Sequence, residues 1–160
     1  MTEKSASPVC YASEADDLYM GYAARDEILT ALNELLEAER AGAKVALVSS
    51  KSETRSGYRE LMRSIRADEA HWCAMLSRHI RRLAGSPTLK TGAFYGKAVV
   101  IVNPAERLLF LNRGQSWVVR KLEKLSPRIR DDLLHADLRA MADNHRKNII
   151  AVDAFLEGAA

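Results

Sequence analysis

The chain has 160 residues, of which 48% are hydrophobic and 28% are charged, and its net charge at pH 7 is +3. This length fits one domain with a sizeable hydrophobic core, and the composition is that of an ordinary globular protein. The charge is too small to indicate a nucleic-acid partner, and every apolar run is shorter than the roughly 20 residues that a membrane span requires.

The N-terminal residues, 1–22, are predominantly polar and contain Pro8 and Gly21, so we expect an extended arm here. Apolar residues are interleaved along this arm, which predicts that it packs on the rest of the protein. They are Val9, Tyr11, Leu18, Tyr19 and Met20. We assign the remaining residues, 23–160, to a single helical bundle.

Two long helices are expected after the arm. The first runs from about Arg25 to Val48, where apolar residues recur at helical spacing, and the polar stretch 49–57 indicates a turn. The second runs from about Tyr58 to Leu83, and the Gly-Ser-Pro sequence at 85–87 ends it. Residues 88–102 then form a connection, which must cross the length of the bundle if the helices form antiparallel pairs.

Two further helices are expected in the second half of the chain. Asn103 can cap the third helix, Pro104 suits its first position, and Glu106 completes a capping box. This helix runs to about Lys124. Ser126 and Pro127 repeat the same signal, and a fourth helix runs to about Leu156. The predicted fold is therefore all-α, an antiparallel four-helix bundle with a long crossover between its second and third helices.

Several ionisable residues fall at helix positions that we expect to face the core. Burying an unpaired carboxylate costs several kcal/mol, so ligand-type side chains on four helices require an explanation. A metal ion in the middle of the bundle supplies one. The candidate ligands are Glu39, Asp68, His71, Glu106 and His145, and Asp68 and His71 share one helix at i, i+3 spacing.

The turns allow a test of this hypothesis, because residues equally far from a short turn lie at the same height on two antiparallel helices. Glu39 precedes the first turn by about as many residues as Asp68 and His71 follow it. Glu106 and His145 are related in the same way across the second turn, if that turn is centred near residue 126. Both helix pairs are therefore expected to bring their candidate ligands together.

Two of these segments resemble motifs of a known family. LNELLEAERAG resembles the first-helix motif of bacterioferritin-type proteins, L-N-x-L-L-x-x-E-x-x-A, which implies that Glu39 is a metal ligand. The segment starting DEAHW resembles the second-helix motif E-x-x-H, with Asp68 in place of the glutamate and His71 as the histidine. Residues 25–156 are thus similar to a ferritin-like domain of the bacterioferritin and rubrerythrin type. The whole chain is most similar to a group of small bacterial ferritin-like proteins.

The chain departs from this family in its fourth helix. A ferritin-like two-metal site has four carboxylates and two histidines, but position 142, where the resemblance implies a glutamate, is alanine. Arg113 shares the inward face of Glu106 and could form an ion pair with Asp137, which would replace the charge of a metal. Asn112 and Gln115 could also reach a polar centre.

Three functions remain open on this basis. The first is a metal-binding protein with a carboxylate and histidine site for iron, as one or two ions, or manganese, acting on oxygen or peroxide. The second is a non-enzymatic structural or interaction protein, whose two-metal site is degenerate and filled by protein ion pairs, with no metal. The third is iron storage or ferroxidase activity. The sequence does not decide whether the protein is an enzyme, an oxidoreductase in the first case.

Each candidate ligand also has a purely structural explanation. A single buried His or Glu is more often a hydrogen-bonded structural residue than a ligand, and Glu106 also suits a helix cap. His79 and His135 have no partners at metal spacing, so we expect them to be structural or exposed.

Assembly and location are expectations from general properties. A homodimer is the commonest assembly for a bundle with an apolar arm. The N-terminal stretch has no apolar leader, and Cys10 and Cys73 form no paired motif, so we expect a cytoplasmic protein.

Overall fold

The computed structural model describes residues 17–52 and 55–158, and within them it contains helices and no β-strand. The predicted all-α four-helix bundle is confirmed. Its long helices are α2 (Arg25–Ser52), α3 (Tyr58–Arg82), α5 (Pro104–Leu125) and α6 (Asp132–Gly158), and two short elements are α4 (Phe94–Val99) and the 3-10 helix η1 (Ser126–Arg128).

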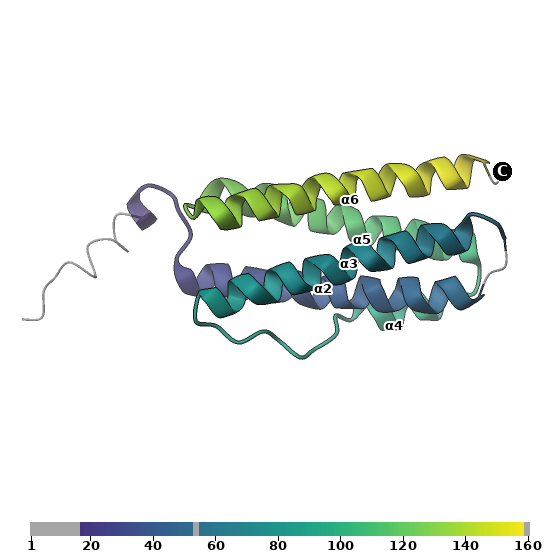
Figure 1. Cartoon of the computed structure of the whole chain (residues 1–160), viewed down its shortest axis with the longest axis horizontal. Helices are drawn as coiled ribbons and strands as arrows, with labels where there is room; N and C mark the ends of the chain where they lie inside the picture. Colours follow the sequence, from purple (N-terminus) through teal and green to yellow (C-terminus); the bar gives the residue numbers. More distant parts are fainter. Residues whose placement is uncertain (1–16, 53–54, 159–160) are drawn as a thin grey trace, which may run out of the picture.

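The four long helices form two hairpins that pack on each other (Figure 1). Helix α2 packs along α3 and helix α5 along α6, while α2 also contacts α5 and α3 contacts α6. All neighbouring helices are antiparallel in this arrangement. The chain must therefore return along the bundle between α3 and α5, and the predicted long crossover is present.

Hydrogen bonds join the crossover to helix α2. Its Gly92 N–H donates to the Glu37 backbone carbonyl at 3.0 Å, and the Thr88 hydroxyl donates to the Glu37 carboxylate at 2.8 Å. A Cβ at Gly92 would lie 3.1 Å from that same carbonyl oxygen, so glycine permits this close approach. The crossover thereby holds α4 against α2 and α5.

A layer of polar side chains divides the hydrophobic core into two parts. We call Glu39, Glu69, Gln115 and His145, one from each long helix, the polar layer; they are 0%, 3%, 2% and 1% exposed. Along every helix the residues on one side of the layer belong to one apolar cluster and those on the other side to a second. The first includes Leu32, Leu35, Met75, Leu122 and Leu138, and the second includes Val45, Met62, Ile65, Leu108 and Val152. The burial of polar groups in such a position opposes folding unless hydrogen bonds or a bound ion compensate for it.

The connection between α5 and α6 differs from the sequence prediction. The prediction that the fourth helix begins near Pro127 is wrong, since Ser126–Arg128 form η1 and α6 begins only at Asp132. An Asp131 side-chain oxygen accepts from the Leu134 N–H at 2.9 Å and caps α6. At α5, the predicted cap is confirmed, because the Asn103 side chain accepts from the Ala105 and Glu106 N–H groups.

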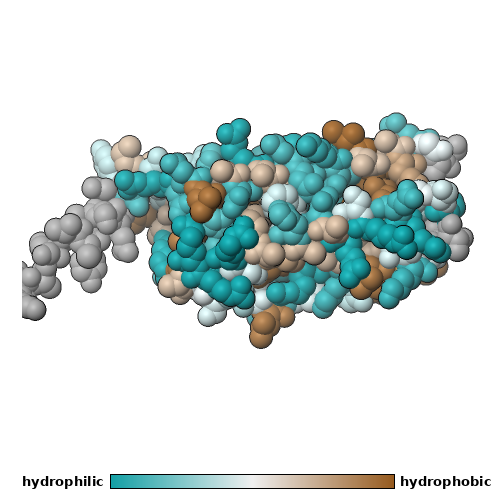
Figure 2. All heavy atoms as spheres, in the orientation of Figure 1, coloured by the Kyte–Doolittle hydropathy of each residue, from teal (hydrophilic) through white to brown (hydrophobic). Residues whose placement is uncertain are grey.

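Most of the expected N-terminal arm, residues 1–16, lies outside the described part of the chain. After it, the Ala23 N–H donates to the Arg128 carbonyl at 2.8 Å and joins the start of α2 to η1. The face of the bundle seen in Figure 2 is mainly hydrophilic, with hydrophobic residues scattered over it. Among the described residues, no helix is long and apolar enough to cross a membrane.

Candidate metal centre

Helix periodicity explains why Glu69 points into the bundle. The buried residues of α3 recur every three or four positions, so their side chains share one face. In order, the members of this series around the site are Tyr58, Met62, Ile65, Glu69, Trp72 and Leu76. Helix α5 shows the same spacing through Leu108, Leu111, Gln115, Val118 and Leu122, which places Gln115 inward.

Three members of the polar layer form a compact cluster with metal-ligand chemistry. Glu39, Glu69 and His145 each offer one ligand atom, and these atoms all lie within 4.8 Å of one another. Glu39 Oε1 is 3.0 Å from His145 Nε2, whereas Glu39 Oε2 has no hydrogen-bond partner among the described residues. Two carboxylates and an imidazole at this spacing can hold a divalent cation.

The second nitrogen of the imidazole fixes the orientation of His145. Nδ1 lies 2.9 Å from the backbone carbonyl of Met141, one turn earlier on α6. A carbonyl oxygen can only accept, so Nδ1 carries the hydrogen and donates it. In the neutral ring Nε2 is then unprotonated and presents its lone pair to Glu39. Histidine ligands of metals are commonly oriented in this way.

Burial changes the acidity of both carboxyl groups. It raises the pKa of Glu39 from the ordinary 4.5 to about 8. The pKa of Glu69 is also raised well above its usual range, chiefly by burial and then by the neighbouring charge of Glu39. Without a cation, both groups therefore favour the protonated form near neutral pH. A bound divalent cation would reverse this preference.

Gly42 makes room for the Glu69 carboxyl group. It lies one turn after Glu39 on α2, and a Cβ there would stand 2.9 Å from Glu69 Cδ and Oε2. Real Cβ atoms do not approach other atoms so closely. Since the neighbouring helix backbone has no side chain at this point, the Glu69 carboxyl can occupy the space beside Glu39.

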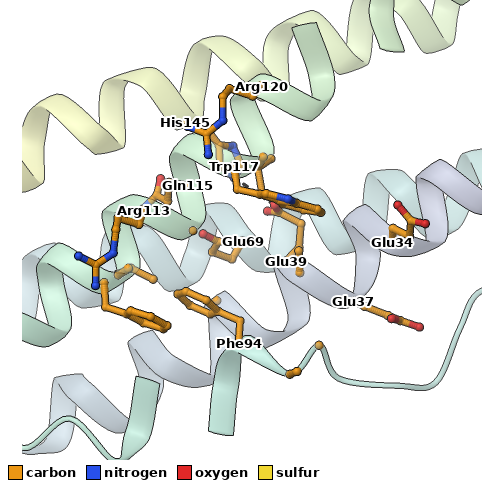
Figure 3. Close-up of a pocket in the computed structure, with 18 residues that line it drawn as sticks. Glu34, Glu37, Glu39, Glu69, Phe94, Arg113, Gln115, Trp117, Arg120 and His145 are labelled. Carbon is orange, nitrogen blue, oxygen red and sulfur yellow. Dashed lines mark hydrogen bonds and ion pairs between the residues drawn. The ribbon is translucent and has the colours of Figure 1, made fainter. Parts of the chain in front are cut away.

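A cavity of about 430 Å³ leads to the cluster between α2, α4 and α5. Glu39, Glu69, Gln115 and His145 all line it, and Figure 3 shows how side chains from separate helices converge there. The remaining wall is largely apolar and includes Phe94, Phe110, Leu111, Trp117 and Val118. Small molecules could therefore reach a cation held by the cluster.

The structure places the two predicted second-helix ligands outside the cluster. Asp68 is only half-buried, and its carboxylate accepts from the side-chain amides of Asn144 and Asn148 at 3.1 Å each. His71 is exposed and contacts the Trp72 ring edge to face. The structure does not bring either residue into the cluster, which receives Glu69 from this helix instead.

The third helix also differs from the prediction. Glu106 is exposed in the first turn of α5, so it does not face the core, whereas Gln115, about two and a half turns further on, does. The expected ion pair between Arg113 and Asp137 does not form. Arg113 is exposed and its guanidinium lies over the Phe110 ring at 5.3 Å, while Asp137 Oδ2 is 2.6 Å from His79 Nε2.

Asn112, which was expected near a polar centre, is buried on α5 but faces α6. Its side-chain amide donates to the Ile149 carbonyl at 3.2 Å and to the Asp153 carboxylate at 2.9 Å. These bonds join α5 to α6. Asn112 does not line the cavity that leads to the cluster.

The residues around the cluster suit one cation better than two. Trp72 stands three residues after Glu69, and Ala142 three residues before His145. Neither can supply a ligand. The Trp72 indole N–H donates instead to the Asn144 side chain at 2.7 Å, and that amide donates to Asp68. A hydrogen-bond network between α3 and α6 thus occupies this side of the layer.

The bundle has a ferritin-like fold, and the buried cluster at its centre is a candidate metal site. A crystal structure described as ferritin-like, diiron-carboxylate proteins from Bacillus anthracis str. Ames superposes with a TM-score of 0.72. The match covers 82% of this chain and 96% of that one at 19% sequence identity, and it supports the fold. No curated protein matches the chain.

Residues 26–154 match the family described as Domain of unknown function (DUF6306). The match extends from the start of α2 almost to the end of α6, and the chain belongs to this family.

Proposed function

We propose that this domain binds one iron or manganese ion through Glu39, Glu69 and His145, and that the bound ion acts on oxygen or peroxide entering by the cavity. The observation that carries this proposal is the convergence of three ligand atoms within 4.8 Å at the centre of the bundle. Glu39 Oε2 has no hydrogen-bond partner among the described residues, and a cation would satisfy this buried acceptor.

The chemistry of the donor set favours these metals. Carboxylate oxygens with imidazole nitrogen suit iron and manganese, and two carboxylates neutralise a divalent charge in a poorly solvated site. Bound iron or manganese would supply redox chemistry toward small oxidants. His145 would coordinate through Nε2, because Nδ1 is committed to Met141.

A single ion distinguishes this proposal from the two-metal site of the structural relative, which is described as a diiron-carboxylate protein. The residues one turn from Glu69 and His145 toward a second position are Trp72 and Ala142. Iron storage through a two-iron ferroxidase centre is less well supported for the same reason.

In the alternative of a non-enzymatic structural protein, positively charged side chains would stand in place of the metal. Arg113 was the candidate for this role, but it is exposed and stacks on Phe110. Within the polar layer, the carboxyl groups of Glu39 and Glu69 lie beside each other and beside the His145 imidazole. Their charge is therefore balanced either by protons or by a bound cation.

Elemental analysis after expression in medium with iron and manganese tests the metal, and oxygen consumption on adding ferrous iron tests the reaction. We expect near-stoichiometric metal in the native protein and in His71→Ala, and loss of both metal and oxygen consumption in His145→Ala. Native protein that stays metal-free in the presence of excess ions would support the structural alternative. Metal without oxygen or peroxide consumption would leave a binding protein.

We further propose that the protein is a cytoplasmic homodimer. Light scattering during gel filtration measures the assembly, and fractionation of cells that express the protein measures its location.

A further inference from the structure

The cavity beside the cluster is larger than oxygen or peroxide requires. Its volume is about 430 Å³, whereas a molecule of water size occupies roughly 30 Å³. Cavities of roughly 300–1,000 Å³ are typical of sites for organic ligands. The space is thus sufficient for an organic molecule next to the metal position.

One wall of the cavity is aromatic, and the Arg113 guanidinium lies over its Phe110 ring. The rings of Phe94 and Phe110 stack with centroids 4.7 Å apart and an angle of 8° between their planes. Glycine at position 114 lets the Phe94 ring pack closely against α5, because a Cβ there would lie 2.8 Å from the ring. Trp117 adds a further aromatic surface. A planar apolar group would fit such a wall.

Gln115 gives the inner end of the cavity a specific polar character. Its side chain is 2% exposed, and neither Oε1 nor Nε2 has a hydrogen-bond partner among the described residues. A buried amide without partners opposes folding. Gln115 lines the same cavity as Glu39 and Glu69 (Figure 3), so its unpaired amide lies beside the space that a ligand would occupy.

A metal ion alone would not satisfy this amide. Coordination would use only Oε1 and would leave the Nε2 donor unpaired. A ligand with one acceptor and one donor on neighbouring atoms would satisfy both, as in a pair of primary amides. A carboxylate fits Gln115 less well, because it brings no donor for Oε1.

We propose that the cavity binds a small organic molecule with a planar apolar body and a neutral head group of the carboxamide type. Gln115 pairs with the head, and Phe94, Phe110 and Trp117 contact the body. That this molecule is a substrate of the metal centre rests on the proposed function, whereas its binding does not. The molecule and the metal occupy adjacent parts of the same site.

Benzamide, benzoate and toluene are suitable probes, since they share a ring and differ in the head group. Gln115 is the only glutamine in the sequence, so glutamine-selective ¹⁵N labelling yields one side-chain amide group in NMR spectra. The full-length chain is titrated at pH 8, both after treatment with a chelator and after loading with Zn²⁺ as a diamagnetic probe metal.

We expect benzamide to shift the Gln115 amide signal saturably in both preparations and to bind about 10-fold more tightly than benzoate or toluene. Gln115→Met keeps the volume of the side chain and removes its polar atoms. In this variant the affinity for benzamide should fall about 10-fold, while the affinity for toluene should not change. The unfolding temperature reports whether the variant remains folded.

Three results would overturn the proposal: no saturable shift with benzamide, equal affinities for benzamide and toluene in the native protein, or equal weakening of both in Gln115→Met. A Gln115 signal that moves with Zn²⁺ and then no longer responds to benzamide would identify the residue as a metal ligand instead. Failure of the native protein to bind iron, manganese or Zn²⁺, with benzamide binding intact, would contradict the proposed function alone.

Discussion

Glu39 Oε1 lies 3.0 Å from His145 Nε2, and both side chains are buried at the centre of the bundle. Since Nδ1 of His145 donates to Met141, the contact between Glu39 and His145 requires a proton from one of the two groups. A divalent cation would displace this proton and contact both atoms. Protons and a metal ion should therefore compete for the cluster.

Metal affinity should rise steeply with pH up to about 8. Burial raises the pKa of Glu39 to about 8 and that of Glu69 above its usual range, so metal binding must remove protons from the folded protein. Calorimetric titration with Mn²⁺ in buffers of different ionisation enthalpy measures the protons released. Release of at least one proton at pH 6.5 is expected, and pH-independent affinity between pH 6 and 8 would contradict the assignment.

The metal-free protein should lose stability as pH rises between about 4.5 and 8. In this range the folded state keeps the proton of Glu39 while the unfolded state, with the ordinary pKa of 4.5, has lost it. The free energy of unfolding should fall by about 1.4 kcal/mol per pH unit for each such group. Urea unfolding at several pH values measures this slope, which Glu39→Gln should reduce and bound metal should reverse.

Gly42→Ala should weaken metal binding with little effect on folding. The added Cβ would overlap the Glu69 carboxyl group and displace it from Glu39. Changes that misplace a ligand without removing it typically lower metal affinity about 10- to 100-fold. Gly96→Ala in α4 is the matched control, because a Cβ there meets nothing within 4 Å. It should leave metal affinity unchanged and stabilise the protein by about 0.5–1 kcal/mol.

Introducing the two missing ligands should create a second metal position. Trp72→His with Ala142→Glu supplies a histidine three residues after Glu69 and a glutamate three residues before His145, the spacing of two-metal bundles. The metal-free variant should be several kcal/mol less stable, because Trp72 belongs to the core. Metal analysis should then give two ions per chain. One ion in a folded variant would show that these positions do not limit the site.

The sequence predicted the helices and two of the three cluster residues, because both depend on local patterns. Apolar periodicity located α2 and α3, and Glu39 and His145 were chosen on the faces that are buried. Asp68 and His71 were also expected to face the core, but the buried face of α3 passes through Glu69 instead. The helical spacing of the apolar residues Tyr58, Met62 and Ile65 places Glu69, and not Asp68, on the buried face of α3.

On the third helix, Gln115 was expected to reach a polar centre and lines the cavity, whereas Glu106 does not face the core, because its expected position depended on long-range geometry. Glu106 and His145 would lie at the same height only with a short turn near residue 126, whereas η1 and the residues before Asp132 lengthen the connection. The α5 residue level with His145 therefore lies nearer the C-terminal end of that helix than Glu106. The buried series of α5 contained Gln115, but an amide among apolar residues gave no signal of a metal-ligand type.

The most direct measurement is an anaerobic titration with ferrous iron that compares the native protein with two variants of adjacent residues, Glu69→Gln and Asp68→Asn. The account predicts one ion per chain for the native protein and for Asp68→Asn, and loss of tight binding for Glu69→Gln. Circular dichroism confirms that each variant is folded. Two ions per native chain, or loss of binding in Asp68→Asn with Glu69→Gln unaffected, would contradict a single metal held by Glu39, Glu69 and His145.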